Sequence, residues 1–170
     1  MATATQTRLF KTKLDLAEPT RAQMVELLNS CLAEIADLRT HAKHAHWNVK
    51  GLQFQQLHEL FELIASRLDR QADDVAERIT ALGGVANGTA RQVVASSNLP
   101  QYDLEAVTGV EHIRALAKRL AVAGGRVRAS LAVAHQLGDD GTGDLLTEIV
   151  RQADKDLWLL EAHLQGEVSL

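Results

Sequence analysis

Residues 54–82, FQQLHELFELIASRLDRQADDVAERITAL, have the apolar spacing of one long α-helix. Their large apolar side chains recur at steps of three, four or seven, as on one face of a helix with about 3.6 residues per turn. These positions are Leu57, Phe61, Ile64, Leu68, Val75, Ile79 and Leu82. Gly83 and Gly84 follow and supply the left-handed residue that commonly ends a helix. The stretch therefore predicts a helix about 43 Å long, with one face toward a core.

A similar spacing precedes this stretch and predicts a first helix over residues 19–48. Pro19 suits the first turn of a helix, where its missing N–H costs no hydrogen bond. The apolar positions recur at steps of three and four, at Met24, Leu28, Cys31, Ile35, Leu38, Ala42 and Ala45. Residues 1–16 lack such spacing, and we expect them to form a mobile polar arm.

The C-terminal half predicts two further helices, over about residues 108–137 and 142–165. Thr108 and Glu111 have the spacing of a capping box at the start of the first of them. Thr142 is the expected N-cap of the second.

The loop lengths predict how these helices are connected. Short turns near residues 50 and 140 join the first helix to the second and the third to the fourth. About 20 residues, GVANGTARQVVASSNLPQYD (84–103), separate the second helix from the third, and ARQVVASS (90–97) within them favours a short helix. One long crossover is the topology of ferritin-like four-helix bundles. With no strand pattern of useful length, the sequence predicts an all-α, ferritin-like bundle that forms a single domain over residues 1–170.

The composition excludes several classes of protein. Eighteen basic and 22 acidic residues give a formal charge of −4, which argues against a surface built as a whole to bind polyanions. The single cysteine, Cys31, cannot form an internal disulfide and fits a reducing compartment. No apolar run resembles a signal peptide or approaches the roughly 20 apolar residues of a membrane span. We therefore expect a soluble, cytoplasmic protein.

A second stripe on residues 54–82 consists of histidine and acids. It lies about 130° around the helix from the apolar stripe, and its members are His58, Glu62, Asp69, Asp73 and Glu77. A solvated charged face is the common explanation of such a stripe. Imidazole and carboxylate groups are also the set that binds first-row divalent metals, and interleaved alanines would let another backbone approach. The stripe is therefore a candidate metal site outside the core of the bundle.

Distance limits how these side chains could bind a metal. His58 and Asp73 are 15 residues apart, which is about 22 Å along one helix, so the pairs His58–Glu62 and Asp73–Glu77 cannot share an ion within one chain. An antiparallel second copy of the helix, centred near residues 67 and 68, would bring each pair against the other pair of its partner. Two-fold contacts of this kind are the commonest oligomer interfaces. The spacing thus predicts a metal centre that exists only in a dimer.

Other metal sites fit the sequence poorly. A di-iron site inside one bundle uses Glu-x-x-His motifs, and the sequence contains none. A closed structural zinc site is also unfavourable, because the ligand set is rich in oxygen and the one cysteine lies elsewhere. A helical bundle without any chemistry is the third hypothesis.

Several rigid spacings together resemble the signature of the Dps family, the mini-ferritins named as DNA-binding proteins from starved cells. The matching residues are His46-Trp47-Asn48-Val49-Lys50-Gly51, Phe54, Leu57-His58, Phe61-Glu62, Asp73, Ala76-Glu77-Arg78 and Leu82-Gly83-Gly84. The resemblance extends from TRLFKTKLDL (7–16) to DKDLWLLEAHLQ (154–165) and so covers nearly the whole chain.

The resemblance implies a hollow homododecamer that oxidises Fe(II), preferably with hydrogen peroxide, stores ferric mineral and protects DNA. Its ferroxidase centres would lie at two-fold interfaces. The iron ligands that it implies are His46, His58 and Glu62 from one chain and Asp73 and Glu77 from its partner. Trp47 matches the family's tryptophan beside the centre. Glu62 stands where the family more often has aspartate, which keeps the charge and lengthens the side chain by one methylene.

The resemblance also implies iron-entry pores lined by acids near the start of the last helix. Asp140, Asp144 and Glu148, at i, i+4 and i+8, are the candidates for this lining. Favourable charge near a helix N-terminus explains any one of them equally well. Gly141 stands where an acid is common in relatives.

DNA binding is the alternative function. Some family members bind DNA through lysine-rich tails, and this chain offers Arg8, Lys11 and Lys13, partly offset by Asp15. Twelve arms on one shell would raise the overall affinity for DNA, because many weak contacts form together. Such binding would make the protein nucleoid-associated.

Overall fold

The computed structural model describes residues 8–166 as five α-helices. Their bounds are α1 (Glu18–Asn48), α2 (Phe54–Ala81), α3 (Ala90–Ser96), α4 (Gly109–Gln136) and α5 (Asp140–Gln165). No strand occurs in this part of the chain, where one isolated bridge joins Lys50 to Thr108. The all-α prediction is confirmed, and each long helix ends within two residues of its predicted bounds.

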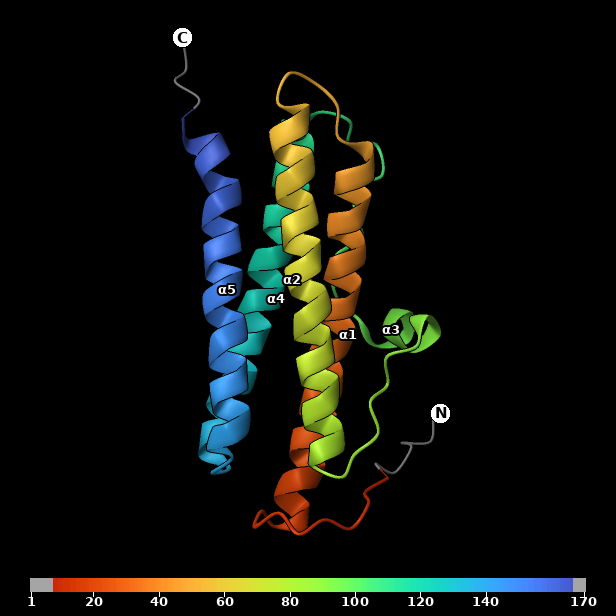
Figure 1. Ribbon diagram of the computed structural model, residues 1–170, viewed down its shortest axis with the longest axis vertical. Helices are drawn as coiled ribbons and strands as arrows, with labels where there is room; N and C mark the ends of the chain where they lie inside the picture. Colours follow the sequence, from red (N-terminus) through yellow and green to blue (C-terminus); the bar gives the residue numbers. More distant parts are fainter. Residues whose placement is uncertain (1–7, 167–170) are drawn as a thin grey trace.

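Four long helices lie side by side in one bundle, with the short α3 outside it beside α1 (Figure 1). Helix α1 packs mainly against α2, and α4 mainly against α5, so the bundle consists of two helical hairpins. The crossover between α2 and α4 carries the chain back along the bundle, and the two helices that it joins therefore run in the same direction (Figure 1). This arrangement confirms the ferritin-like topology predicted from the loop lengths.

The core is formed by the apolar stripes of the four long helices. On α2, Phe61, Ile64, Val75 and Ile79 have no exposed surface, and they belong to one hydrophobic cluster with side chains of the other long helices. None of the helices in residues 8–166 is long and apolar enough to cross a membrane. Because the apolar stripe of α2 is buried, its acid and histidine stripe faces outward.

Helix α4 begins with the capping box that the sequence predicts. Thr108 Oγ1 accepts a hydrogen bond from the Glu111 N–H at 3.4 Å, and Glu111 Oε2 accepts one from the Thr108 N–H at 2.8 Å. The hydrogen bonds from the Thr108 and Val107 backbones lower the pKa of Glu111 to about 2. The carboxylate is therefore ionised throughout the physiological range.

The predicted cap of α5 is wrong. Asp139, and not Thr142, is the N-cap, and its Oδ1 accepts a hydrogen bond from the Thr142 N–H at 3.0 Å. Asp139 Oδ2 also accepts a bond from the Thr142 hydroxyl at 2.5 Å, so Thr142 is a partner of the cap. The helix consequently begins at Asp140, two residues earlier than predicted.

Part of the predicted mobile arm is held against the bundle. Residues 1–7 of that arm lie outside the described residues. The Phe10 N–H donates to the Gly83 carbonyl oxygen at 2.7 Å. Gly83 has φ +88°, and a Cβ there would lie 2.6 Å from the Phe10 oxygen, so this contact requires glycine. Phe10 thus lies beside the end of α2, and the mobility of the arm stays a prediction.

Two glycines lie inside α4, where the sequence gives no reason for them. A Cβ on Gly124 would meet the Ala153 Cβ at 3.5 Å, an ordinary contact, and a Cβ on Gly125 would meet nothing within 4 Å.

We expect Gly125→Ala to raise the free energy of unfolding by about 1 kcal/mol, because alanine loses less backbone entropy in a helix. Urea unfolding measures the change. Gly138→Ala is the control and should destabilise, since Gly138 has φ +73°. An unchanged midpoint for Gly125→Ala would show that this glycine serves another purpose.

Candidate metal centre

His46 and His58 meet where α1 ends and α2 begins. Their rings stack with centroids 3.8 Å apart and an interplanar angle of 20°. His46 Nδ1 lies 2.8 Å from the carbonyl oxygen of His58, and His58 Nδ1 lies 2.8 Å from the carbonyl oxygen of His46. A carbonyl oxygen can only accept a hydrogen bond, so each Nδ1 carries a proton and donates it.

This reciprocal pairing leaves Nε2 as the free nitrogen of each ring. In a neutral imidazole protonated on Nδ1, Nε2 has the lone pair that binds a metal. His46 Nε2 lies 3.3 Å from Oε2 of Glu62. Because this lone pair and the Glu62 carboxylate lie next to each other, both suit binding to one cation. The structure thus places His46 next to both His58 and Glu62, and their role as iron ligands stays a prediction.

Lys43 stands beside this group, and the sequence pattern does not single it out. Its Nζ donates a hydrogen bond to Glu62 Oε2 at 2.5 Å and lies 5.6 Å from the centre of the Trp47 ring. This hydrogen bond, helped by the charge of Lys43, lowers the pKa of Glu62. The carboxylate is therefore ionised at neutral pH. Helical spacing could have indicated that Lys43 lies near this group, because it is three residues before His46 on α1.

Asp73 and Glu77 lie farther along α2, and the structure does not bring them to the histidines. Both are exposed. Within residues 8–166, no group of three or more histidine, cysteine, aspartate or glutamate side chains is placed to hold a metal ion. The predicted ligands of one chain therefore form two separate groups, one where α1 ends and α2 begins and one farther along α2.

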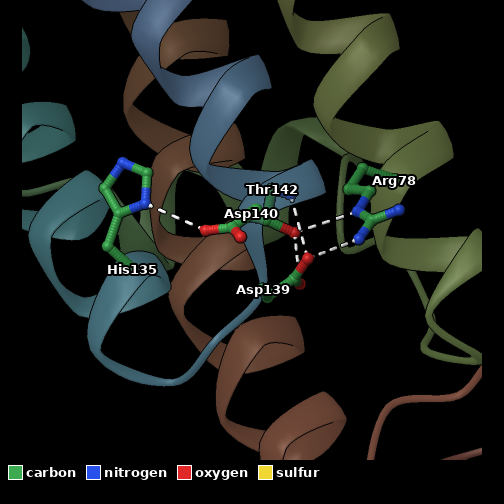
Figure 2. A network of polar contacts seen from close by, with 5 residues as sticks. All are labelled: Arg78, His135, Asp139, Asp140 and Thr142. Carbon is green, nitrogen blue, oxygen red and sulfur yellow. Dashed lines mark hydrogen bonds and ion pairs between the residues drawn. The ribbon is translucent and has the colours of Figure 1, made fainter.

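A polar network joins α2 to the start of α5 (Figure 2). Arg78 Nη2 donates to Asp139 Oδ1 at 2.7 Å, and Arg78 Nε donates to Thr142 Oγ1 at 2.9 Å. Asp139 is only 2% exposed, so the guanidinium offsets the cost of burying its charge. Arg78 follows Glu77 directly in the sequence, and the network therefore fixes the Glu77 end of α2 against α5.

A surface cavity of about 430 Å³ lies beside this network, between α2 and α5. Glu77, Asp144 and Glu148 are among its lining residues. Two of the predicted pore acids thus share a cavity with a predicted iron ligand. Asp140 does not line it: its Oδ1 lies 3.3 Å from His135 Nδ1, and its side chain is 89% exposed (Figure 2).

Comparison with known proteins places the chain among related sequences and structures. Residues 25–167 match the Ferritin-like domain family. The chain is 37% identical over 158 residues to the DNA protection during starvation protein of Agrobacterium fabrum, with 93% of this chain and 98% of that protein covered. DpsA14 from Streptomyces coelicolor has a TM-score of 0.89 at 30% identity, covering 97% of this chain and 99% of that one. The tetragonal form of Mycobacterium smegmatis Dps has a TM-score of 0.88 at 29% identity, covering 92% and 94%.

Lys43→Met tests the electrostatics of the histidine group without any metal. The variant removes the hydrogen bond and the charge that lower the pKa of Glu62. The Glu62 pKa should then rise toward its ordinary value, and the carboxylate should take up its proton at a higher pH than in the wild type. NMR titration of isotope-labelled glutamate carboxyls measures this. Lys50→Met, on the turn between α1 and α2, is the control. An equal shift in both variants, or a shift in neither, contradicts the role of Lys43.

Proposed function

We propose that this chain, which belongs to the Dps family of ferritin-like proteins, oxidises Fe(II) with hydrogen peroxide at centres shared between two subunits. One observation carries the proposal: the candidate ligands lie in two separate groups, and neither is placed to hold a metal ion by itself among residues 8–166. His46, at the end of α1, lies beside His58 and Glu62 near the start of α2, and Asp73 and Glu77 lie farther along α2. An antiparallel second copy of α2 would complete both sets at once and give two equivalent centres.

Exposed apolar side chains around the histidine group support an interface there. Leu52 is fully exposed, Trp47 is 65% exposed, and Leu63 and Phe54 are 43% and 40% exposed. Apolar surface of this kind marks interaction sites in proteins. We propose that dimers formed through this face assemble further into the homododecamer that the family implies, with ferric mineral stored inside.

The two sets of ligands fit iron as the substrate. The imidazole Nε2 atoms can hold an Fe(II) ion while other positions stay open to the oxidant. The carboxylates of Glu62, Asp73 and Glu77 attract Fe(III) more strongly than Fe(II), because the attraction grows with the charge of the ion. Two Fe(II) ions each give one electron to one peroxide, so the O–O bond breaks without release of hydroxyl radical. Trp47 lies beside the centre, where its indole can intercept a one-electron oxidant.

Iron would reach these centres past the acids at the start of α5. Asp144 and Glu148 line the same cavity as Glu77, which supports a path between them. Asp140, which pairs with His135 and is exposed, would form the outer part of this path.

The iron assay tests the assigned ligands. Fe(II) is added without oxygen, peroxide follows, and ferric absorbance is recorded by stopped flow. His58→Ala removes an imidazole ligand and should slow oxidation at least about tenfold, the effect common even for a lost outer partner of a metal ligand. His163→Ala is the control, because His163 is exposed on α5 and bonds only the Leu159 carbonyl oxygen. Fast oxidation that survives His58→Ala refutes the centre, and a bundle without chemistry would oxidise no iron in any variant.

The shared centre makes activity depend on assembly. Ser66 is exposed on the ligand face of α2, next to the centre of the predicted two-fold pairing. Ser66→Arg should separate the subunits in size exclusion and abolish fast oxidation, because the ligand sets of two chains no longer meet. Ser66→Ala is the matched control and should keep both assembly and activity. A folded, monomeric Ser66→Arg that oxidises iron at the wild-type rate contradicts a shared centre.

DNA binding is the second candidate function, and the basic residues of the N-terminal arm would make the contacts. Arg8, Lys11 and Lys13 are exposed, whereas residues 1–7, MATATQT, contain no lysine or arginine. With so few cations per subunit, we expect weak, salt-sensitive binding that relies on many copies of the arm. A cytoplasmic shell of this kind would protect DNA mainly by removing Fe(II) and peroxide together, whether or not it stays on the nucleoid.

The described end of the arm is joined to the helical bundle. Arg21 donates to the carbonyl oxygens of Leu16, at 3.3 Å, and Leu82, at 2.8 Å, and so holds the arm to the end of α2. A gel shift with plasmid DNA at two salt concentrations measures the binding, with Lys11→Glu as the test and Lys155→Glu on α5 as the control. Retardation that persists at physiological salt and is lost in Lys11→Glu would favour DNA binding as a main function.

A further inference from the structure

A second cavity, of about 530 Å³, lies between α1, α3 and the crossover, with α3 standing beside α1 (Figure 1). Trp47 and Tyr102 both line it, together with His41 and His44. Trp47 belongs to the surroundings of the proposed iron centre, whereas Tyr102 lies on the crossover and is only 5% exposed. The cavity therefore connects an exposed indole with a buried phenol.

The ring of Tyr102 is enclosed by nitrogen-bearing side chains. The His44 ring lies 5.0 Å from it and the His41 ring 5.3 Å, measured between centroids. The Arg119 guanidinium carbon lies 4.9 Å from the centroid of the same ring. His44 and Trp47 are three residues apart on α1, so their Cβ atoms are about 5–6 Å apart. Trp47, His44 and Tyr102 consequently form a series of neighbouring side chains.

The hydroxyl of Tyr102 has a hydrogen-bond partner in α4. It lies 2.9 Å from Nδ1 of His112, which is completely buried in α4. Burial raises the pKa of Tyr102 and lowers the pKa of His112. At neutral pH the phenol is therefore protonated and the imidazole is neutral. A proton donor and a proton acceptor are thus held in contact.

A purely structural role accounts poorly for His112. Its Nε2 is buried and has no hydrogen-bond partner among residues 8–166. An unpaired buried polar atom costs about 1–3 kcal/mol, and an apolar side chain with a similar shape would avoid that cost. In the tautomer with its proton on Nε2, however, Nδ1 is free to accept the phenol proton. The histidine therefore suits proton acceptance better than packing.

We propose that Tyr102 and His112 form a one-electron redox pair that receives oxidising equivalents from Trp47. This inference rests on the proposed iron oxidation as the source of the oxidant. When a single Fe(II) ion, rather than a pair, reduces hydrogen peroxide, it yields hydroxide and a hydroxyl radical, and this radical takes an electron and a proton from the Trp47 indole and becomes water. The Trp47 radical then takes one electron from Tyr102 and one proton from water, and the phenol proton moves to Nδ1 of His112.

The transfer restores Trp47 and leaves a phenoxyl radical beside a protonated imidazole. An electron from a further Fe(II) returns Tyr102 to its starting state as the proton comes back from His112. Between these events the radical lies on the buried ring of Tyr102. The oxidising equivalent therefore stays inside the subunit.

Electron paramagnetic resonance tests the proposal, because Tyr102 is the only tyrosine of the chain. Wild-type protein is mixed with Fe(II) and peroxide and frozen within milliseconds. We expect a tyrosyl signal whose hyperfine splitting narrows when the protein is made with ring-deuterated tyrosine, a label that leaves the sequence unchanged. Tyr102→Phe should lose the signal, and its tryptophanyl radical should persist longer. Absence of a tyrosyl signal, with tryptophanyl decay equal in the wild type and Tyr102→Phe, overturns the proposal.

The other tryptophan supplies a matched control. Trp158, on α5, is the chain's second tryptophan and is 59% exposed. Trp158→Phe should keep the tyrosyl signal, whereas Trp47→Phe should lose it. His112→Gln, which replaces the imidazole by a much weaker base, should slow formation of the tyrosyl radical. The opposite ranking of the two tryptophan variants contradicts the assigned route.

A second experiment separates this inference from the iron function. Pulse radiolysis of azide solutions generates the azide radical, which oxidises tryptophan without iron. The decay of the tryptophanyl absorption band and the rise of the tyrosyl band then report electron transfer from Tyr102. Transfer in that experiment supports the redox pair even if the wild type oxidises no iron, a result that would refute the proposed function alone. Normal iron oxidation without this transfer overturns the redox pair alone.

Discussion

The reciprocal hydrogen bonds between His46 and His58 close the first helical hairpin and define its free nitrogens at the same time. The last carbonyl oxygens of a helix have no partner within it, and the ring of His58 satisfies one of them at the end of α1. Each histidine thereby orients the other, as the outer partner of a metal ligand usually does. The fold supplies that partner from its own backbone, so the chemistry of the site and the closure of the hairpin depend on the same two bonds.

The rotation of α2 about its axis is the second constraint. Buried side chains such as Phe61 and Val75 hold one face of α2 in the core, and an ion pair from Arg67 to Asp156 and another from Arg78 to Asp139 tie it to α5. The ligand stripe cannot turn inward without breaking these contacts. His58 and Asp73 also remain about 22 Å apart, because a helix is rigid over this length. The proposed completion of a centre by a second chain is consistent with this orientation of α2.

Local patterns predicted most of the fold, because apolar periodicity and capping spacing are properties of neighbouring residues. The helices and the Thr108–Glu111 box follow from such patterns. The N-cap of α5 does not, because Asp139 is held buried by Arg78, which is 61 residues away in the sequence. The contact between Phe10 and Gly83 and the bond from Lys43 to Glu62 also join different elements of the chain. Contacts of this kind depend on the assembled bundle, which spacing along the chain does not describe.

The bond between Lys43 and Glu62 bears on how the proposed centre would bind a metal ion. In the free chain the ammonium neutralises the carboxylate at 2.5 Å. A metal that uses Glu62 must displace this ammonium, and at equal distance an ion of charge two attracts a carboxylate twice as strongly as an ion of charge one. The face of Trp47, 5.6 Å from Lys43 Nζ, offers the displaced cation a favourable place nearby. The exchange would therefore favour divalent over monovalent cations at the proposed centre.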